Sequence, residues 1–105
     1  EGIDLIKKLL PIVDNFERSI AMDKTVDEKY LAGYKMIYTN MLEILTNTGV
    51  KEIECNDKPF DPNTMEAILT EHVEGVDKGY VLMVLQKGYI YKDKLLRPAM
   101  VKVSE

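Results

Sequence analysis

The sequence predicts an α+β protein in two parts, a helical region over residues 1–48 and a small all-β domain over residues 49–105. Apolar residues recur at helical spacing up to Thr48, and at strand spacing after it. Gly49 stands at the change and fits the left-handed position that ends many helices. After it, turn-forming residues separate five or six short apolar runs, which is typical of a small β domain.

The first helix is expected from Ile3 to Ile20. At about 100° per residue, its apolar side chains fall within an arc of about 180°, opposite a charged face. This phase continues across Pro11, although a proline inside a helix removes one backbone hydrogen bond and costs about 3 kcal/mol. Pro11 therefore marks a kink or the first turn of a new helix. The second option is slightly favoured, because proline is common at a first helical position.

A second helix is expected from Tyr30 to Thr48, after a polar stretch at residues 23–28. Its apolar arc of about 160° exceeds the roughly 100° that one neighbouring helix covers. Two helices from each of two identical chains would close a four-helix bundle and cover both arcs, so a homodimer is predicted. In the alternative, the β half covers the excess within a monomer.

The residues expected at the contact between the two copies lie on this second helix: Tyr30, Gly33, Tyr34, Ile37 and Met41. Glycine inside a helix costs about 1 kcal/mol relative to alanine, which suggests that a neighbouring helix backbone comes close to Gly33. Gly33 could also be a tolerated surface glycine.

In the β half, strands are expected at residues 50–55, 67–73, 81–86, 89–91 and 95–103. Pro98 lacks an N–H group, so the last strand is expected to lie at a sheet edge or to carry a bulge there. The rigid loop at residues 57–63, with Pro59, Phe60 and Pro62, is interpreted as a brace between the helical and β halves.

Composition excludes several classes of function. A net charge of −4, with only two arginines far apart, argues against nucleic acid as a partner. No apolar run approaches the ~20 residues that cross a bilayer, and no signal-peptide pattern opens the chain, so no membrane is expected. The chain begins in the middle of a helical pattern without an initiator Met, and we expect it to be the C-terminal part of a longer protein.

Catalytic and cofactor motifs are also missing. One cysteine, Cys55, and one histidine, His72, can form neither an internal disulfide nor a common zinc site, so no metal and a reducing, cytoplasmic setting are expected. The glycines do not fit phosphate-binding spacings, so no cofactor and no direct nucleotide binding are expected. A small hydrolase would have to use the carboxylates of the β half, whose spacing fits neither an acid/base pair nor a calcium loop: Asp57, Asp61, Glu66, Glu71 and Glu74.

Several motifs, in the same order along the chain, resemble the C-terminal part of the GrpE family. They are LLPIVDNFER at residues 9–18, PFDPN at 59–63 followed by EA at 66–67, VLQKGY at 84–89 and LRPAMVKV at 96–103, with Gly33 between the first two. Family members commonly carry histidine where this chain has Met65, so any hydrogen bond of that histidine is expected to be absent. The resemblance implies a co-chaperone, not an enzyme, that pairs through helices. Its β domain would dock on the ATPase domain of the DnaK chaperone and open the cleft to release ADP.

The resemblance also implies the docking residues: Leu85, Lys87, Lys94, Arg97, Met100 and Val103. Lys94 lies in an expected turn at residues 92–94, where a cation can reach an acidic partner and raise the association rate. Leu85 and Val103 would supply apolar area, although Leu85 could equally be a core residue and Lys94 an ordinary turn residue. An alternative function is a dimeric helical adaptor whose β domain binds another protein, or a peptide at an edge strand.

Overall fold

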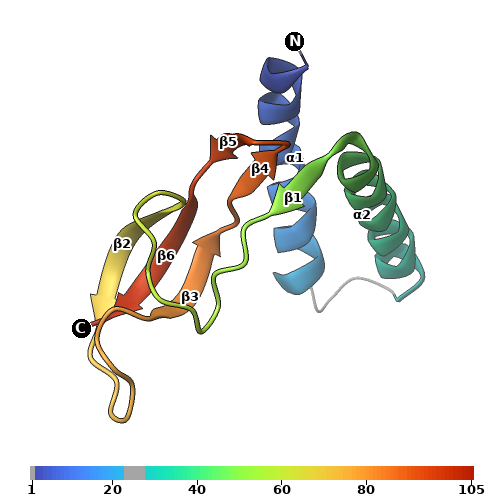
Figure 1. Cartoon of the computed structure of the whole chain (residues 1–105). Helices are drawn as coiled ribbons and strands as arrows, with labels where there is room; N and C mark the ends of the chain where they lie inside the picture. The colour runs from blue at the N-terminus through green and yellow to red at the C-terminus, as the bar shows by residue number, and fades with distance from the viewer. Residues whose placement is uncertain (1, 23–27) are drawn as a thin grey trace. The chain divides into compact units, whose positions relative to one another are not determined.

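The computed structural model describes residues 2–22 and 28–105 (Figure 1), so most of the polar stretch expected at residues 23–28 lies outside the described residues. The chain divides into two compact units, Glu1–Val50 and Lys51–Glu105, called here the helical unit and the β unit. The described residues form two helices followed by six strands in two sheets, which confirms the α+β fold.

Helix α1 runs from Ile3 to Met22 and passes through Pro11 without a break. The favoured expectation that Pro11 begins a new helix is therefore wrong. Leu10 and Val13, on either side of the proline, are each only 1% exposed, whereas Pro11 faces solvent. Burial of a continuous apolar face, at about 1.5–3 kcal/mol for each large side chain, offsets the roughly 3 kcal/mol that the missing hydrogen bond costs.

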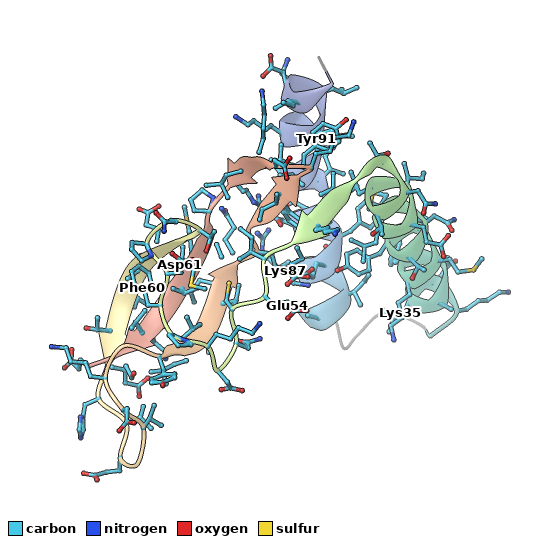
Figure 2. All side chains as sticks on the ribbon, in the orientation of Figure 1. Lys35, Glu54, Phe60, Asp61, Lys87 and Tyr91 are labelled. Atoms are coloured by element: carbon cyan, nitrogen blue, oxygen red, sulfur yellow. The ribbon has the colours of Figure 1, made fainter. Side chains whose placement is uncertain are left out.

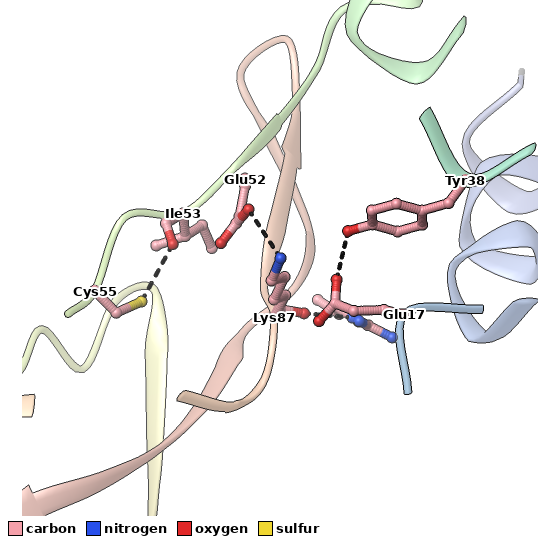
Figure 3. Close-up of polar contacts among 7 residues, drawn as sticks. Glu17, Tyr38, Glu52, Ile53, Cys55 and Lys87 are labelled. Carbon is pink, nitrogen blue, oxygen red and sulfur yellow. Dashed lines mark hydrogen bonds and ion pairs between the residues drawn. The ribbon is translucent and has the colours of Figure 1, made fainter. Parts of the chain in front are cut away.

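Helix α2 runs from Glu28 to Thr48 and ends at Gly49, as expected. The Gly49 N–H donates to the carbonyls of Leu45 and Thr46, both at 3.1 Å, and its φ of 115° lies in the region that favours glycine. The two helices are tied together by the Tyr38 hydroxyl, which donates to the Glu17 carboxylate at 2.6 Å (Figure 3).

The larger part of the β unit is a three-stranded sheet in the order β2–β6–β3. Strand β6 (Ala99–Ser104) lies in the centre, pairing in parallel with β2 (Met65–Glu71) and antiparallel with β3 (Val81–Gln86). One face of this sheet carries the main core, whose most buried members include Val81, Ala99 and Val101.

The second sheet has the order β1–β4–β5, formed by β1 (Val50–Glu52), β4 (Tyr89–Tyr91) and β5 (Lys94–Arg97). Strands β4 and β5 form a hairpin in which Tyr91 pairs with Lys94 and Tyr89 with Arg97. The single strand expected at residues 95–103 is split at Pro98: β5 belongs to one sheet and β6 to the other. Pro98 thus lies between two strands, where its missing N–H breaks no ladder.

The loop at residues 57–63 is fixed within the β unit. The Phe60 N–H donates to the Gly79 carbonyl at 2.8 Å, Pro59 bridges to Tyr80, and the Phe60 ring packs against the core (Figure 2). Met65, at the position of the family histidine, is 7% exposed, and its sulfur accepts a hydrogen bond from the Asp61 N–H at 3.4 Å. A weak thioether bond therefore replaces part of what a histidine could provide.

Candidate functional site

The polypeptide passes between the two sheets of the β unit twice, and both connections lie at one junction. Residues Lys87 and Gly88 lead from β3 to β4, and Pro98 leads from β5 back to β6. A Cβ on Gly88 would lie 2.8 Å from both Ala99 Cα and Ile53 Cδ1, and closer still to the Ala99 nitrogen. Only glycine allows the two connections to pass at this separation.

Hydrogen bonds hold the same junction. The Arg97 guanidinium donates through Nε to the Lys87 carbonyl at 2.8 Å and lies 5.3 Å from the centroid of the Tyr89 ring. The Gly88 carbonyl accepts from the Ile53 N–H at 2.9 Å. These bonds fix the base of the β4–β5 hairpin to the β3–β4 connection and to Ile53, which directly follows β1.

The structure brings four of the six expected docking residues to this junction. Leu85 is 44% exposed at the end of β3, and its neighbour Gln86 pairs with the half-buried Met100. Lys87 points toward Glu52, with 3.6 Å between Nζ and Oε1 (Figure 3). Arg97 completes the group.

The other two expected docking residues lie elsewhere. Lys94 is exposed at the far end of the hairpin, three residues along β5 from Arg97. Val103 is 7% exposed and belongs to the core cluster, because the odd-numbered residues of β6 face the core. Packing is the role that this burial supports for Val103.

Charge is unevenly distributed along the β unit. Five of the chain's 14 cationic side chains but only one carboxylate, Asp93, lie between residues 87 and 102. The cations are Lys87, Lys92, Lys94, Arg97 and Lys102. In a chain with net charge −4, this segment is called here the local positive surface, although Lys87 and Lys102 lie within 4 Å of Glu52 and Glu71. A partner of opposite charge would be attracted to its remaining cations.

Lys92 is a residue that the sequence analysis did not single out. It has a φ of 55°, a conformation that costs a side chain with a Cβ about 1–2 kcal/mol. Its ammonium lies 5.1 Å from the centroid of the Tyr91 ring, at the tip of the hairpin (Figure 2). The turn at residues 92–94 was expected, but no pattern shows that a lysine adopts a positive φ there.

The candidate catalytic residues have structural partners or are inaccessible. His72 is exposed, with Nε2 3.7 Å from Glu74 Oε1. Cys55 is 2% exposed, and its Sγ contacts the Ile53 carbonyl at 3.3 Å. Burial, reinforced by the charge of Glu52 and opposed by that of Lys58, raises the pKa of the Cys55 thiol, which disfavours the nucleophilic thiolate.

Two of the carboxylates considered for hydrolysis, Asp61 and Glu71, are engaged locally. Asp61 accepts from the Asn63 N–H at 2.9 Å, and Glu71 accepts from Lys102 at 2.8 Å, a bond that lowers the pKa of Glu71. In residues 2–22 and 28–105, no group of three or more His, Cys, Asp or Glu side chains is placed to hold a metal ion. The same residues contain no helix long and apolar enough to cross a membrane.

The helical unit carries an apolar depression of about 130 Å³. It is lined by Leu9, Ile12, Val13, Met41, Ile44 and Leu45. Ile44 is 65% exposed and Ile12 is 47% exposed, so much of this apolar surface faces solvent in the single chain.

The residues expected at a dimer contact lie on α2, and three of them are well exposed: Tyr30 at 65%, Tyr34 at 43% and Ile37 at 45%. A Cβ on Gly33 would meet no atom within 4 Å, so nothing in the described part of the chain approaches it closely. Met41 is half-buried and lines the depression.

Comparison with known proteins decides the family, because the GrpE family model matches residues 2–105. The chain belongs to the GrpE family. It is 45% identical over 105 residues to the GrpE protein of Carboxydothermus hydrogenoformans, covering 100% of this chain and 54% of that protein. It is 50% identical over 99 residues to the GrpE protein of Alkaliphilus oremlandii, covering 92% of this chain and 52% of that protein. The chain thus spans about half the length of the curated relatives it matches.

Proposed function

We propose that this chain is the partner-binding part of a non-catalytic nucleotide exchange factor for a DnaK-type chaperone. The observation that carries the proposal is membership of the GrpE family over residues 2–105. The local positive surface at residues 87–102 supports it, because an acidic chain needs such a segment to associate quickly with an acidic partner. A cytoplasmic setting stays a prediction.

Exchange of this kind needs no catalytic residue. If the β unit binds the open form of the ATPase domain more tightly than the closed, nucleotide-bound form, linkage requires that ADP binds less tightly to the complex. Each 1.4 kcal/mol of that preference weakens nucleotide binding by about tenfold. A rigid surface serves this purpose better than a flexible one, because ordering it on docking costs less free energy.

The proposed docking surface is formed by Leu85, Lys87, Lys94, Arg97 and Met100. Leu85 and Met100 supply apolar area beside the junction, where Lys87 and Arg97 also lie, and Lys94 adds a cation at the far end of the hairpin. The bond between Arg97 and the Lys87 carbonyl supports a rigid arrangement of these groups.

The proposal includes a homodimer in which the α1–α2 depression of each copy is covered by the other, closing a four-helix bundle. The exposed apolar side chains of α2 support it, because monomeric soluble proteins rarely leave large contiguous apolar surfaces in contact with water. Gly33, with open space around it, would admit the close approach of a helix from the second copy.

Release of fluorescent ADP from the isolated ATPase domain of a DnaK chaperone tests the function. We expect the chain to accelerate release, and Lys94→Glu to reduce the effect severalfold at low salt because it reverses a charge in the contact. Lys78→Glu is the matched control, since Lys78 is also exposed but lies in the loop between β2 and β3, at the other end of the β unit (Figure 1).

The outcomes separate the candidate functions. Unchanged release with the unmodified chain would overturn the exchange function and favour the adaptor. Equal loss in the Lys94 and Lys78 variants would show that total charge, not this surface, controls association. Turnover of any substrate by the chain alone would revive the hydrolase.

A further inference from the structure

The turn between β4 and β5 explains the conformation of Lys92 but not the choice of a lysine. Tyr91 pairs with Lys94, so Lys92 and Asp93 form a two-residue hairpin loop, and the favoured turns of this length require a positive φ at the first loop residue. Glycine, asparagine and aspartate adopt a positive φ most readily, and the β unit uses these residue types at its other positive-φ positions: Asp57, Gly75 and Gly79. At the hairpin tip the chain instead carries a lysine at a φ of 55°. A residue type that the turn does not favour points to a role for its side chain.

The surroundings of Lys92 differ from those of three other cations of the β unit. Lys58, Lys87 and Lys102 each lie within 4 Å of a carboxylate, of Glu54, Glu52 and Glu71 respectively. In the part of the chain that the structure describes, neither Lys92 nor Lys94 has such a carboxylate partner. Two ammonium groups without an ion-pair partner within 4 Å therefore lie at the same tip, on either side of the exposed Asp93, and the tip keeps a net positive charge.

One contact of the Lys92 ammonium, together with the fixed base of the hairpin, limits the positions that the ammonium can take. It lies 5.1 Å from the centroid of the Tyr91 ring, a cation–π geometry that holds it beside the hairpin. The base of the hairpin is in turn fixed by the Arg97 bond to the Lys87 carbonyl and by the close packing at Gly88. The charge is thus positioned before any partner arrives, which reduces the entropy lost on binding.

We propose that Lys92 is a further docking residue, whose ammonium contacts a carboxylate on the acidic surface of the partner's ATPase domain together with Lys94. This inference rests on the proposed function and deepens it by adding a contact that does not follow from the family motifs. A lysine at this position lowers the stability of the β unit, because of its positive φ, but places a cation where the partner docks.

Substitution of Lys92 should therefore have opposite effects on the unfolding midpoint and on the rate of association with the partner. Lys92→Asn removes the charge and supplies a residue that tolerates the left-handed conformation. We expect its unfolding midpoint to equal or exceed that of the unmodified chain by up to a few degrees. We also expect its association rate with the ATPase domain to fall by about threefold or more at low salt, with the difference shrinking as salt rises.

Two matched variants isolate the cause. Lys92→Arg keeps both the charge and the strain, and should associate at close to the original rate. Lys78→Asn removes an exposed cation from the distant loop and should leave the association rate within about twofold, because its charge lies outside the contact. Stopped-flow fluorescence with the ATPase domain and thermal unfolding of each variant provide the two readouts.

The inference is overturned if Lys92→Asn associates as fast as the unmodified chain, or if its unfolding midpoint drops by several degrees, which would make Lys92 a structural residue. These results leave the exchange function intact as long as the unmodified chain accelerates ADP release. Failure of the unmodified chain to accelerate release would overturn both proposals.

Discussion

Gly88→Ala tests whether the junction between the two sheets is as tight as the structure indicates. The added Cβ would lie 2.8 Å from Ala99 Cα and from Ile53 Cδ1, and nearer still to the Ala99 nitrogen. Two of these three atoms are backbone, and Ala99 is 0% exposed at the start of the central strand β6, so the main chain cannot move without disturbing the core.

The expected cost follows from these contacts. Overpacking of a tight core typically costs about 1–3 kcal/mol, and distortion of the Ile53 N–H bond to the Gly88 carbonyl adds about 1 kcal/mol. A total of roughly 2–4 kcal/mol would lower the unfolding midpoint of a domain of this size by about 10–25 °C. Scanning calorimetry, with amide exchange of the β-unit strands as a local probe, measures the change.

A second substitution identifies which contact causes the loss. Ile53→Val removes the Cδ1 atom and should cost about 0.5–1.5 kcal/mol alone, but less in the Gly88→Ala background because it relieves one of the three contacts. Gly2→Ala is the control, since a Cβ there meets no atom within 4 Å. A midpoint within about 2 °C of the unmodified chain for Gly88→Ala would refute the reasoning.

Two further predictions concern the helices and the buried thiol. If a second copy packs against Gly33, Gly33→Ala should weaken the dimer measurably in sedimentation, although alanine alone favours the helix by about 1 kcal/mol. Gly33→Asp should prevent pairing, because it places a charge against apolar surface. An intact dimer in both variants would contradict this contact. Because the pKa of the Cys55 thiol is raised by folding, the folded chain holds that proton more tightly, and stability should decrease as pH rises through the ordinary value of 9.0. Cys55→Ala should show a smaller decrease between pH 8 and pH 10 in urea unfolding, and an identical decrease would mean that other groups cause it.

The helices could be predicted well from the sequence because their apolar period is long and unbroken. The end of α2 at Thr48 and its cap at Gly49 follow from local residue types. The expectation that Pro11 begins a new helix was wrong because it used only the preference of proline for a first helical position. Whether the helix continues through Pro11 depends on the burial of the apolar side chains around it. Leu10 and Val13 become almost fully buried on either side of it, and no local rule contains that information.

The β unit was less predictable, because strand pairing joins residues that are distant in the sequence. A strand was expected at residues 67–73, but β2 begins at Met65, which pairs with Ala99 across the parallel ladder. A methionine at that position gives no sequence signal until its partner is known. Similarly, Pro98 indicated an irregularity but not that β5 and β6 belong to different sheets.

In the candidate site too, some residues could be placed from their neighbours in the sequence, whereas others depend on how the strands pack. The exposure of Lys94 follows from its place beside a turn, and that residue was found correctly as a surface cation. The burial of Val103 depends on the phase of β6. Lys102 indicates the solvent face, and strand alternation then directs Val101 and Val103 toward the core, but the buried polar Ser104 does not follow that alternation. The left-handed lysine at position 92 has no sequence signature, because lysine has little intrinsic preference for that conformation.

The proposed docking groups are arranged by interior contacts, among them the close passage at Gly88 and the Arg97 bond to the Lys87 carbonyl. A substitution at Gly88, which is not one of the proposed docking residues, would shift the hairpin relative to Leu85 and Met100 without changing a group that touches the partner. Such a variant should slow exchange in proportion to its loss of stability, whereas substitution of the proposed contact residue Lys92 should slow exchange while stability holds or rises. Measuring stability and association together therefore distinguishes the residues that build this surface from those that bind through it.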